Sequence, residues 1–541
     1  MTVRRNADML QLNEKGLENR QEWVEKGYRL PGFDRAGMIA ATAEAPVWVH
    51  FGAGNIFRAF QCAAMQKLLD AGKAKAGIIA VEGFDYEIVE KGYRANDNYS
   101  LLVTLKSDGS VEKTVIGSIA ESCMLDSNNE PEFRHLKEIF KNPSLQMATF
   151  TITEKGYVVR DAADGIVPAV AADLAAGPEK PQSYLGKVAS LLYARYQAGG
   201  VPIAMVSTDN CSHNGEKLFQ AMKVFAEGWK DEGFLSWISD PAKVSFPWTM
   251  IDKITPRPDA SVEALLRADG LQGLDPVITS RHTYIAPFVN AEESEYLVIE
   301  DAFPNGRPPL EATGFYFTDR DTVNNVERMK VTTCLNPLHT ALAVYGCLLG
   351  YTRISDEMKD PDLVALIRRI GYTEGLPVVT DPGILNPKEF IDTVVNVRLP
   401  NPFMPDTPQR IACDTSQKVP IRFGETIRSY LADPARDGKS LTAIPLAIAG
   451  WLRYLLGIDD QGQAFEISPD PLLPRLQEAL AGIALGKPET AEGKLDALLA
   501  DPVLFGSDLL GTGLDETIKA DFAALLAGPG AVRRVLHETL S

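Results

Sequence analysis

The chain contains 541 residues, which predicts two or three domains at roughly 150 residues each. Apolar residues make up 45% and charged residues 23%, as is typical of a protein with a large core. The 54 Lys and Arg residues against 72 Asp and Glu residues give a net charge of −18. This acidic balance argues against general nucleic-acid binding, which needs a basic surface.

Two further features concern the cellular compartment. No run approaches the roughly 18 consecutive apolar residues of a membrane span, and the N-terminus lacks the apolar stretch of a signal peptide. The six cysteines lie far apart with no CxxC pair, which fits a reducing compartment. We therefore expect a cytoplasmic protein without membrane contact.

The first part of the chain alternates between strand-like and helix-like patterns. Residues 1–45 are polar and mixed in charge, and we interpret them as an N-terminal extension laid over a domain. The apolar run 47–51, the glycine turn 52–54, a helical pattern over 57–69 and a second apolar run over 77–81 predict the opening of a parallel α/β sheet. Further strands are expected at 100–105, 147–152 and 203–207, and helices at 182–197 and 216–227.

From about residue 323 the pattern becomes helical. Helices are expected at 338–349, 363–370, 421–431, 441–456 and 520–526, separated by Pro- and Gly-rich turns. We therefore predict an α/β domain over 46–325 and a mainly α-helical domain over 326–541.

The glycine turn is a candidate dinucleotide site. Gly52 and Gly54 follow a buried strand and would let the backbone approach a pyrophosphate at a helix N-terminus. Phe57 stands where the third glycine of the usual pattern would fall. Glu82 ends the next strand, near the distance at which an acid binds the ribose 2′-hydroxyl, and Asp85 could take the same role. An acid there repels a 2′-phosphate and favours NAD; the alternative is a plain strand–helix turn.

Polar segments follow several predicted strands. Ligands of open α/β sheets bind at the carboxyl ends of strands, so residues 151–157 and 207–215 are candidate rims of a site. Asn210 is the better candidate in the second segment, because an amide can donate to a developing alkoxide. Ordinary loop exits are the alternative for both segments, and a surface strand edge is the alternative for 250–258.

The segment 327–339 is the most informative one. Asn336 and His339 are three residues apart, on one helix face, and Pro337 fits the first turn with Asn336 as its cap. Glu327 and Lys330 precede them at helical spacing. A partly buried lysine can lose its proton readily, which suits an acid/base. The alternative is that Asn336 only caps the helix and His339 only packs.

Residues 398–418 form a further polar segment. Two of its side chains, Arg398 and Lys418, are separated cations that could bind an anionic substrate. The alternative is a solvated loop. Zinc alcohol dehydrogenase chemistry is disfavoured, because the His and Cys residues show no ligand spacing, and no metal site is expected.

Taken together, these segments resemble the polyol-specific long-chain dehydrogenase/reductase family, which includes mannitol and arabinitol dehydrogenases and the fructuronate and tagaturonate reductases. The resemblance covers residues 46 to 420 and rests on seven motifs in the family order: GAGNIFRA (52–59), TITEKGY (151–157), DNCSHNG (209–215), MIDKITP (250–256), VIEDAFPNGRP (298–308), ERMK…LNPLHTALA (327–343) and RLPNP…DTSQK (398–418). It implies a Rossmann-type domain, a helical domain, an active site in the cleft between them and metal-independent hydride transfer with NAD(P).

The resemblance also implies residue roles. Lys330 is similar to the family's catalytic lysine, the general acid in ketone reduction and the base in alcohol oxidation. Asn210 and Asn336 are similar to the two amides of its oxyanion hole. His339 is similar to a histidine that positions a substrate hydroxyl, and Glu327 to a glutamate that links the lysine to solvent.

Further roles concern the two ligands. Asp252 matches a substrate-pocket aspartate, and Arg398 and Lys418 fall where the family places substrate-contacting cations. In the glycine-turn motif, Asn55 and the pair Phe57–Arg58 are predicted to join Gly52, Gly54 and Glu82 in binding the cofactor.

One departure from the family concerns the lysine. Five residues lie between Lys330 and Asn336, whereas the family has four. A π-bulge beside Pro337, which lacks an N–H, would absorb the extra residue and re-aim the lysine.

These observations predict an NAD-dependent oxidoreductase that interconverts a keto sugar acid and its aldonate, such as D-fructuronate and D-mannonate. The substrate carboxylate needs a cation, which Arg398, Lys418 or Arg422 could supply. The alternatives are a mannitol- or arabinitol-type polyol dehydrogenase, a tagaturonate reductase, and a non-catalytic NAD-binding protein. A monomer or small homo-oligomer is expected.

Overall fold

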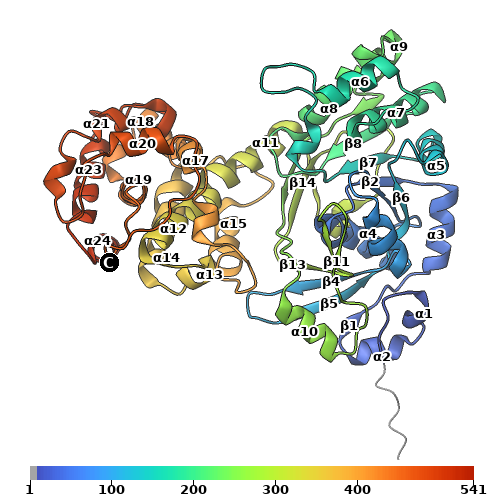
Figure 1. Cartoon of the computed structure of the whole chain (residues 1–541), viewed down its shortest axis with the longest axis horizontal. Helices are drawn as coiled ribbons and strands as arrows, with labels where there is room; N and C mark the ends of the chain where they lie inside the picture. The colour runs from blue at the N-terminus through green and yellow to red at the C-terminus, as the bar shows by residue number, and fades with distance from the viewer. Residues whose placement is uncertain (1–8) are drawn as a thin grey trace, which may run out of the picture. The chain divides into compact units, whose positions relative to one another are not determined.

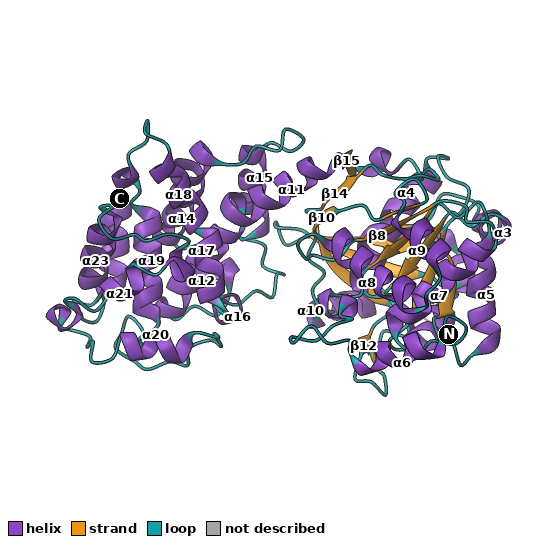
Figure 2. Ribbon diagram, turned by 90° about the horizontal axis from the view of Figure 1, so that it is seen from above, coloured by secondary structure: helices purple, strands orange, loops and turns teal. Residues whose placement is uncertain are grey.

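The computed structural model describes residues 9–541, which form two compact units (Figure 1). Unit 1 contains the described residues up to Lys106 together with Ser110–Asn324, and unit 2 contains Ser107–Gly109 and Asn325–Ser541. Strands are confined to unit 1, whereas unit 2 consists of helices and loops (Figure 2). The predicted combination of a Rossmann-type fold and a mainly helical C-terminal fold is confirmed. Residues 1–8 of the predicted N-terminal extension lie outside the described residues.

A six-stranded parallel sheet forms the centre of unit 1. Its strand order is β6-β3-β2-β7-β8-β9, with bounds Ile119–Met124, Ile78–Glu82, Trp48–Phe51, Met147–Phe150, Ile203–Ser207 and Val244–Ser245. Every residue of β2, β3, β7 and β8 is buried, because both faces of the sheet are covered. The apolar runs of the sequence are therefore the strands of a doubly covered sheet.

The side chains of β2 alternate between two hydrophobic cores. Val49 and Phe51 face a core shared with α5 (Glu130–Lys141), α7 (Tyr184–Gln197), α8 (Asn214–Gly228) and α9 (Glu232–Ser239). Trp48 faces the other core, which includes residues of α3 (Arg35–Glu44) and α4 (Cys62–Asp70). This alternation follows the two-residue period of a strand.

Smaller sheets complete unit 1. One has the order β1-β5-β4-β13, with bounds Tyr28–Arg29, Val111–Ile116, Ser100–Leu105 and Phe288–Glu292. The expected strand over 100–105 forms, but it belongs to this mixed sheet. Short helices α1 (Glu14–Leu17) and α2 (Arg20–Glu25) precede β1, so the described N-terminal residues contribute a strand.

A three-stranded sheet contains β10 (Thr249–Asp252), β14 (Tyr296–Glu300) and β15 (Tyr316–Thr318). β10 is an edge strand of this sheet, but all four of its residues are buried, so the alternative of a surface position is wrong for residues 250–252.

Unit 2 is built around two buried helices, α12 (Asn336–Leu349) and α19 (Ala443–Tyr454), which contact each other. The other helices of eight or more residues that lie wholly in this unit are α14 (Pro361–Arg368), α17 (Thr415–Arg422), α18 (Gly424–Ala432), α23 (Leu514–Leu525) and α24 (Ala531–Leu540). Within residues 9–541, no helix is both long and apolar enough to cross a membrane.

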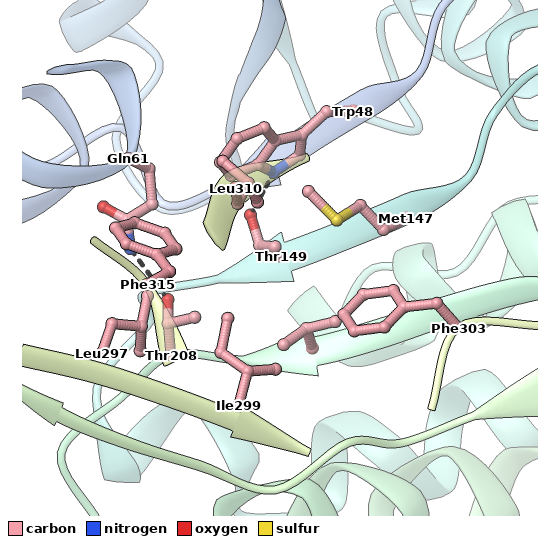
Figure 3. Close-up of a pocket in the computed structure, with 11 residues that line it drawn as sticks. Trp48, Gln61, Met147, Thr149, Thr208, Leu297, Ile299, Phe303, Leu310 and Phe315 are labelled. Carbon is pink, nitrogen blue, oxygen red and sulfur yellow. Dashed lines mark hydrogen bonds between the residues drawn. The ribbon is translucent and has the colours of Figure 1, made fainter. Parts of the chain in front are cut away.

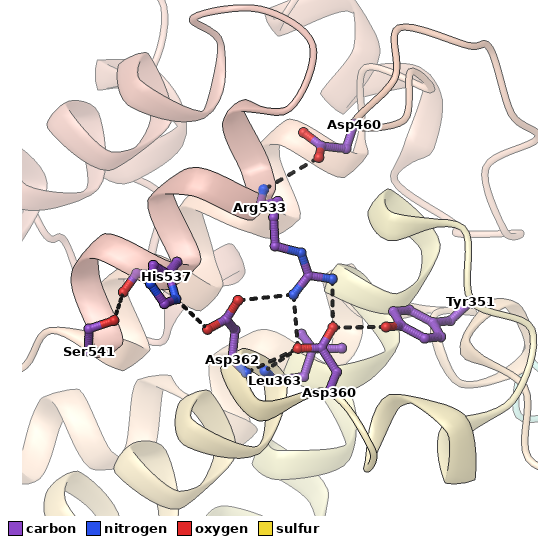
Figure 4. Close-up of polar contacts among 8 residues, drawn as sticks. All are labelled: Tyr351, Asp360, Asp362, Leu363, Asp460, Arg533, His537 and Ser541. Atoms are coloured by element: carbon purple, nitrogen blue, oxygen red, sulfur yellow. Dashed lines mark hydrogen bonds and ion pairs between the residues drawn. The ribbon is translucent and has the colours of Figure 1, made fainter.

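Ion pairs hold the C-terminal helix in place (Figure 4). Arg533 of α24 pairs with Asp360 at 2.6 Å and with Asp362 at 3.1 Å, at the N-terminus of α14. His537 Nδ1 lies 3.0 Å from Asp362, and the Tyr351 hydroxyl donates to Asp360 at 2.8 Å. The acids that begin α14 therefore hold α24 against it.

Candidate active site

The glycine turn follows β2 directly. Gly52 has φ +101°, and a Cβ there would lie 2.1 Å from the carbonyl oxygen of Thr151, so a side chain does not fit. Gly54 is exposed, and the space where its Cβ would lie is open. The helical backbone begins at Asn55. An open backbone turn at a helix N-terminus is the arrangement that binds a pyrophosphate.

Glu82 shapes this turn from the end of β3. Its buried carboxylate accepts hydrogen bonds from the N–H groups of Ala53 at 3.0 Å, Phe84 at 2.7 Å and Asp85 at 3.1 Å. Burial raises the pKa of Glu82, while these backbone donors oppose the rise. Asp85 is also buried and accepts from the Thr279 hydroxyl at 2.5 Å. Glu82 is therefore the acid next to the glycine turn.

Two residues predicted to bind the cofactor lie in the core. The Phe57 ring is fully buried and stacks on His50, with ring centroids 4.1 Å apart. Arg58 is buried and donates to the carbonyl of Ala286 at 2.8 Å and to Asn55 Oδ1 at 2.9 Å. The side chains of Phe57 and Arg58 therefore support the turn from the protein interior, and contact of these two residues with the cofactor stays a prediction. The bulk of Phe57 at the third-glycine position is accommodated against His50.

The loops after β7 and β8 are joined by Asp209. Its carboxylate accepts from the N–H groups of Ile152 and Thr153, both at 2.9 Å, and from the Tyr157 hydroxyl at 2.6 Å. Thr153 has φ +64°, in the left-handed region that non-glycine residues rarely adopt. The predicted alkoxide donor Asn210 is exposed and follows Asp209 immediately. Sequence reasoning missed Asp209, because an Asp at a strand exit is typical of any turn.

A second link reaches β10. Asn214 is fully buried, and its amide donates to the Thr249 hydroxyl at 2.8 Å and to the carbonyl of Asp209 at 2.9 Å. Asn214 therefore connects the β8 loop to the first residue of β10. Asp252 is buried at the other end of this strand.

In unit 2, Lys330 begins a π-helical segment, η6 (Lys330–Cys334), which follows α11 (Arg320–Met329). The N–H of Leu335 donates to the Lys330 carbonyl at 3.1 Å, five residues back. The predicted π-bulge is therefore confirmed, and it absorbs the extra residue before Asn336. Lys330 is buried and Glu327 is half-buried.

The first turn of α12 differs from the prediction in one respect. Asn336 is the first residue of the helix, and its N-cap is Leu335, with no side-chain cap hydrogen bond. The predicted capping by Asn336 is wrong, because η6 runs into α12 and moves the boundary by one residue. Pro337 does stand in the first turn.

His339 lies in a positively charged environment. Its Nε2 atom is 3.5 Å from Asp406 Oδ2 and has no hydrogen-bond partner in the described part of the chain. Burial, and then the charges of Arg422, Arg410, Arg398 and Lys418, lower the pKa of His339 to about 3. The imidazole is therefore neutral at physiological pH and can accept or donate a hydrogen bond.

The two predicted substrate cations differ in their surroundings. Arg398 is buried at the end of a second π-helical segment, η9 (Val394–Arg398). Lys418 lies on α17, and its ammonium group donates to the carbonyls of Ile411, at 3.0 Å, and Cys413. Burial, and then Arg422, lower the pKa of Lys418. Both side chains contribute to the positive field at His339.

One group of residues has the composition of a metal site. In the described chain, ligand atoms of Glu121, Cys123 and His135 lie within 4.8 Å of one another. His135 Nε2 is 2.5 Å from Glu121, and the Cys123 thiol donates to the same carboxylate at 3.2 Å. Burial raises the pKa of this thiol, so these contacts form a hydrogen-bonded cluster with a protonated thiol.

A small apolar cavity lies between the parallel sheet and β14 (Figure 3). Its polar lining is limited to Gln61, Thr149 and Thr208, of which Gln61 donates to Thr208 at 3.0 Å. Trp48 Nε1 donates to Thr149 at 2.7 Å. No charged residue lines it, so this cavity does not suit an anionic ligand.

Together, the sheet and the glycine turn define unit 1 as a Rossmann-type domain. Residues 47–312 match the model of the mannitol dehydrogenase Rossmann domain, and residues 322–526 match that of the mannitol dehydrogenase C-terminal domain. The chain therefore belongs to the mannitol dehydrogenase family, and the resemblance in its motifs is confirmed.

Individual relatives span nearly the whole chain. The D-mannonate oxidoreductase of Thermotoga maritima is 50% identical over 538 residues, which cover 98% of this chain and 99% of that protein. The polyol:NADP oxidoreductase of Gluconobacter oxydans is 32% identical, with 81% and 85% covered. A solved ternary complex of Pseudomonas fluorescens mannitol 2-dehydrogenase with NAD and D-mannitol has a TM-score of 0.67 at 26% identity, covering 98% of this chain and 99% of that one.

Proposed function

We propose that the protein is an NAD-dependent oxidoreductase that interconverts D-fructuronate and D-mannonate. The observation that carries the substrate class is the positive field at His339, to which four cations contribute (Arg398, Arg410, Lys418 and Arg422). A sugar acid has a carboxylate that such cations can bind, whereas a neutral polyol has no charge to match them. The extensive identity to a protein named D-mannonate oxidoreductase supports the same substrate.

Unit 1 has the features needed to hold NAD. The open backbone at Gly54 and the helix N-terminus at Asn55 fit a pyrophosphate, and Gly52 makes the turn possible. Glu82 at the end of β3 favours a ribose with a free 2′-hydroxyl over a 2′-phosphate. The solved Pseudomonas relative contains NAD, which agrees with this assignment. When bound, the nicotinamide supplies or accepts the hydride.

Unit 2 supplies the proton in this proposal. Lys330 donates a proton to the ketone oxygen during reduction and removes it from the hydroxyl during oxidation. The amides of Asn336 and Asn210 donate hydrogen bonds to the alkoxide as its charge develops. The neutral imidazole of His339 forms a hydrogen bond with a substrate hydroxyl. Glu327 transfers protons between Lys330 and solvent.

The test is NADH oxidation, followed by absorbance, with fructuronate, tagaturonate, fructose and xylulose compared side by side and NADPH run in parallel. We expect kcat/KM to be highest with fructuronate and NADH. Preference for fructose or xylulose would assign a polyol dehydrogenase, and preference for tagaturonate would assign the epimeric acid. NADH binding without turnover of any substrate would favour a non-catalytic protein.

The polyol alternative has its own support, because the solved Pseudomonas relative is a mannitol 2-dehydrogenase in complex with D-mannitol, a neutral sugar alcohol. We further propose that the enzyme acts in the cytoplasm, as its composition and cysteine pattern favour. We also propose that it is a monomer or small homo-oligomer. Light scattering after size-exclusion chromatography and cell fractionation test these two points.

A further inference from the structure

Arg422 has an unusual position for a cation. It ends α17, and its Nη1 atom donates to the Thr340 hydroxyl of α12 at 2.6 Å. The side chain is half-buried, and burial lowers the pKa of Arg422 to about 10. In residues 9–541 no carboxylate lies within ion-pair distance of this guanidinium. A partly buried charge without a counter-charge is costly, and an arginine does not escape the cost by losing its proton at neutral pH.

Two acids near this site have other partners, and a third, Asp414, is exposed and acts on Lys418. Asp406, the acid beside His339, forms an ion pair with Arg410. Asp470 also acts on Lys418, but its oxygens accept from the hydroxyl and N–H of Ser416 at 2.5 and 2.8 Å. The positive charge of Arg422 is therefore left for a ligand to balance.

We propose that Arg422 binds the carboxylate of the sugar acid and so determines the preference for acids over neutral ketoses. The planar guanidinium matches a carboxylate in a two-point hydrogen bond, and Thr340 orients it. This inference rests on the proposed function, since it takes the substrate to be a sugar acid.

The spacing along α12 fits this placement. Asn336 precedes Thr340 by four residues, a rise of about 6 Å along the helix axis. In fructuronate the ketone lies four carbon–carbon bonds from the carboxylate carbon, a span of about 5 Å. A substrate with its carboxylate at Arg422 can therefore reach the predicted alkoxide donor Asn336 with its ketone. His339 lies between the two positions in sequence and is available to the intervening hydroxyls.

The experiment compares Arg422→Met with Arg428→Met in the full-length protein. Arg428 lies on the neighbouring helix α18, where it bonds the Gly506 carbonyl at 2.9 Å and pairs with Glu425, so it serves as a matched control. We expect R422M to raise KM for fructuronate about 100-fold, since charge-assisted hydrogen bonds are strong. kcat/KM for fructose should change by less than about twofold, and R428M should leave the acid-to-neutral ratio unchanged. R422K should restore part of the fructuronate affinity.

Thermal unfolding gives a second readout that does not depend on turnover. Removing an uncompensated, half-buried charge is expected to leave the Tm of the ligand-free protein equal or higher. D-mannonate should raise the Tm of the wild type and R428M but not of R422M, whereas D-mannitol should show no such difference.

An equal fall in kcat/KM for both ketoses, or an unchanged KM for fructuronate, would overturn the inference. If the wild type reduced no sugar acid, the proposed function would fail. A mannonate-specific rise in Tm that depends on Arg422 would still support the subsite, and its absence would reject it.

Discussion

The two units differ in how the charges of their predicted site residues are balanced. In unit 1, Glu82 and Asp209 each accept three hydrogen bonds from groups in their own and neighbouring loops. In unit 2, Arg422 has a hydroxyl as its partner and no acid, and His339 lies in a positive field. The charged side chains of the two units therefore serve different purposes. In unit 1 the two carboxylates fix backbone loops, and in unit 2 the Arg422 guanidinium is available for a charged ligand.

The largest effect should come from Lys330→Ala. Loss of the acid/base is expected to lower kcat about 1,000-fold, within the range that proton transfer contributes to catalysis. NADH affinity, measured by fluorescence titration, should change by less than about twofold, because the cofactor is assigned to unit 1. Lys223→Ala, on α8, provides a lysine control and should keep full activity. Similar kcat values for K330A and the wild type would remove Lys330 from the mechanism.

A pair of glycine variants sharpens the assignment of unit 1. Gly54→Ala places a methyl group in open space, so Tm should be unchanged, while NADH Kd should rise at least about tenfold if the pyrophosphate approaches there. Gly52→Ala forces a side chain to φ +101° and against the Thr151 carbonyl, so it should lower Tm as well. Unchanged NADH affinity in G54A would exclude the turn as the cofactor site.

A further prediction concerns Glu357, a buried acid of unit 2 whose pKa is raised. The Glu357 carboxyl has no hydrogen-bond partner among the described residues, and burial, followed by Asp360, raises its pKa to about 9. The folded state therefore binds more protons than the unfolded state between pH about 4.5 and 9. Stability falls as pH rises through this window, by up to about 1.4 kcal/mol per pH unit.

Glu357→Gln removes this dependence. Its Tm relative to the wild type should therefore increase from pH 5 to pH 8, by roughly 2–4 °C for each kcal/mol, in scanning calorimetry. Glu374 is a contrasting buried acid, because its carboxylate accepts from the N–H groups at Thr442, Ala443 and Ile444, where α19 begins. E374Q should lower Tm at neutral pH. Parallel Tm–pH curves for E357Q and the wild type would contradict the assignment of Glu357.

Local patterns were sufficient to predict the framework. Apolar runs identified β2, β3, β7 and β8, because strands covered on both faces consist almost wholly of apolar residues. The π-segment after Lys330 was predictable for a geometric reason. An extra residue between two helical positions has to be absorbed by a wider turn.

Long-range contacts were not predictable from such patterns. The strand at 100–105 joins the mixed sheet because it pairs with β13, nearly 190 positions later in the chain, and no local pattern contains that partner. The burial of Phe57 depends on His50, and the role of Asp209 depends on the loop after β7. The sequence does not distinguish Arg422 from the two other candidate cations. The absence of an acid beside Arg422 is a property of the folded unit, as residues 9–541 show.

The division of roles between the two units is tested most directly by NADH binding to three variants, G54A, K330A and R422M, followed by fluorescence titration under identical conditions. We expect NADH Kd to rise at least about tenfold in G54A and to stay within about twofold of the wild type in K330A and R422M. Weakened NADH binding in R422M or K330A, with G54A unaffected, would contradict this division.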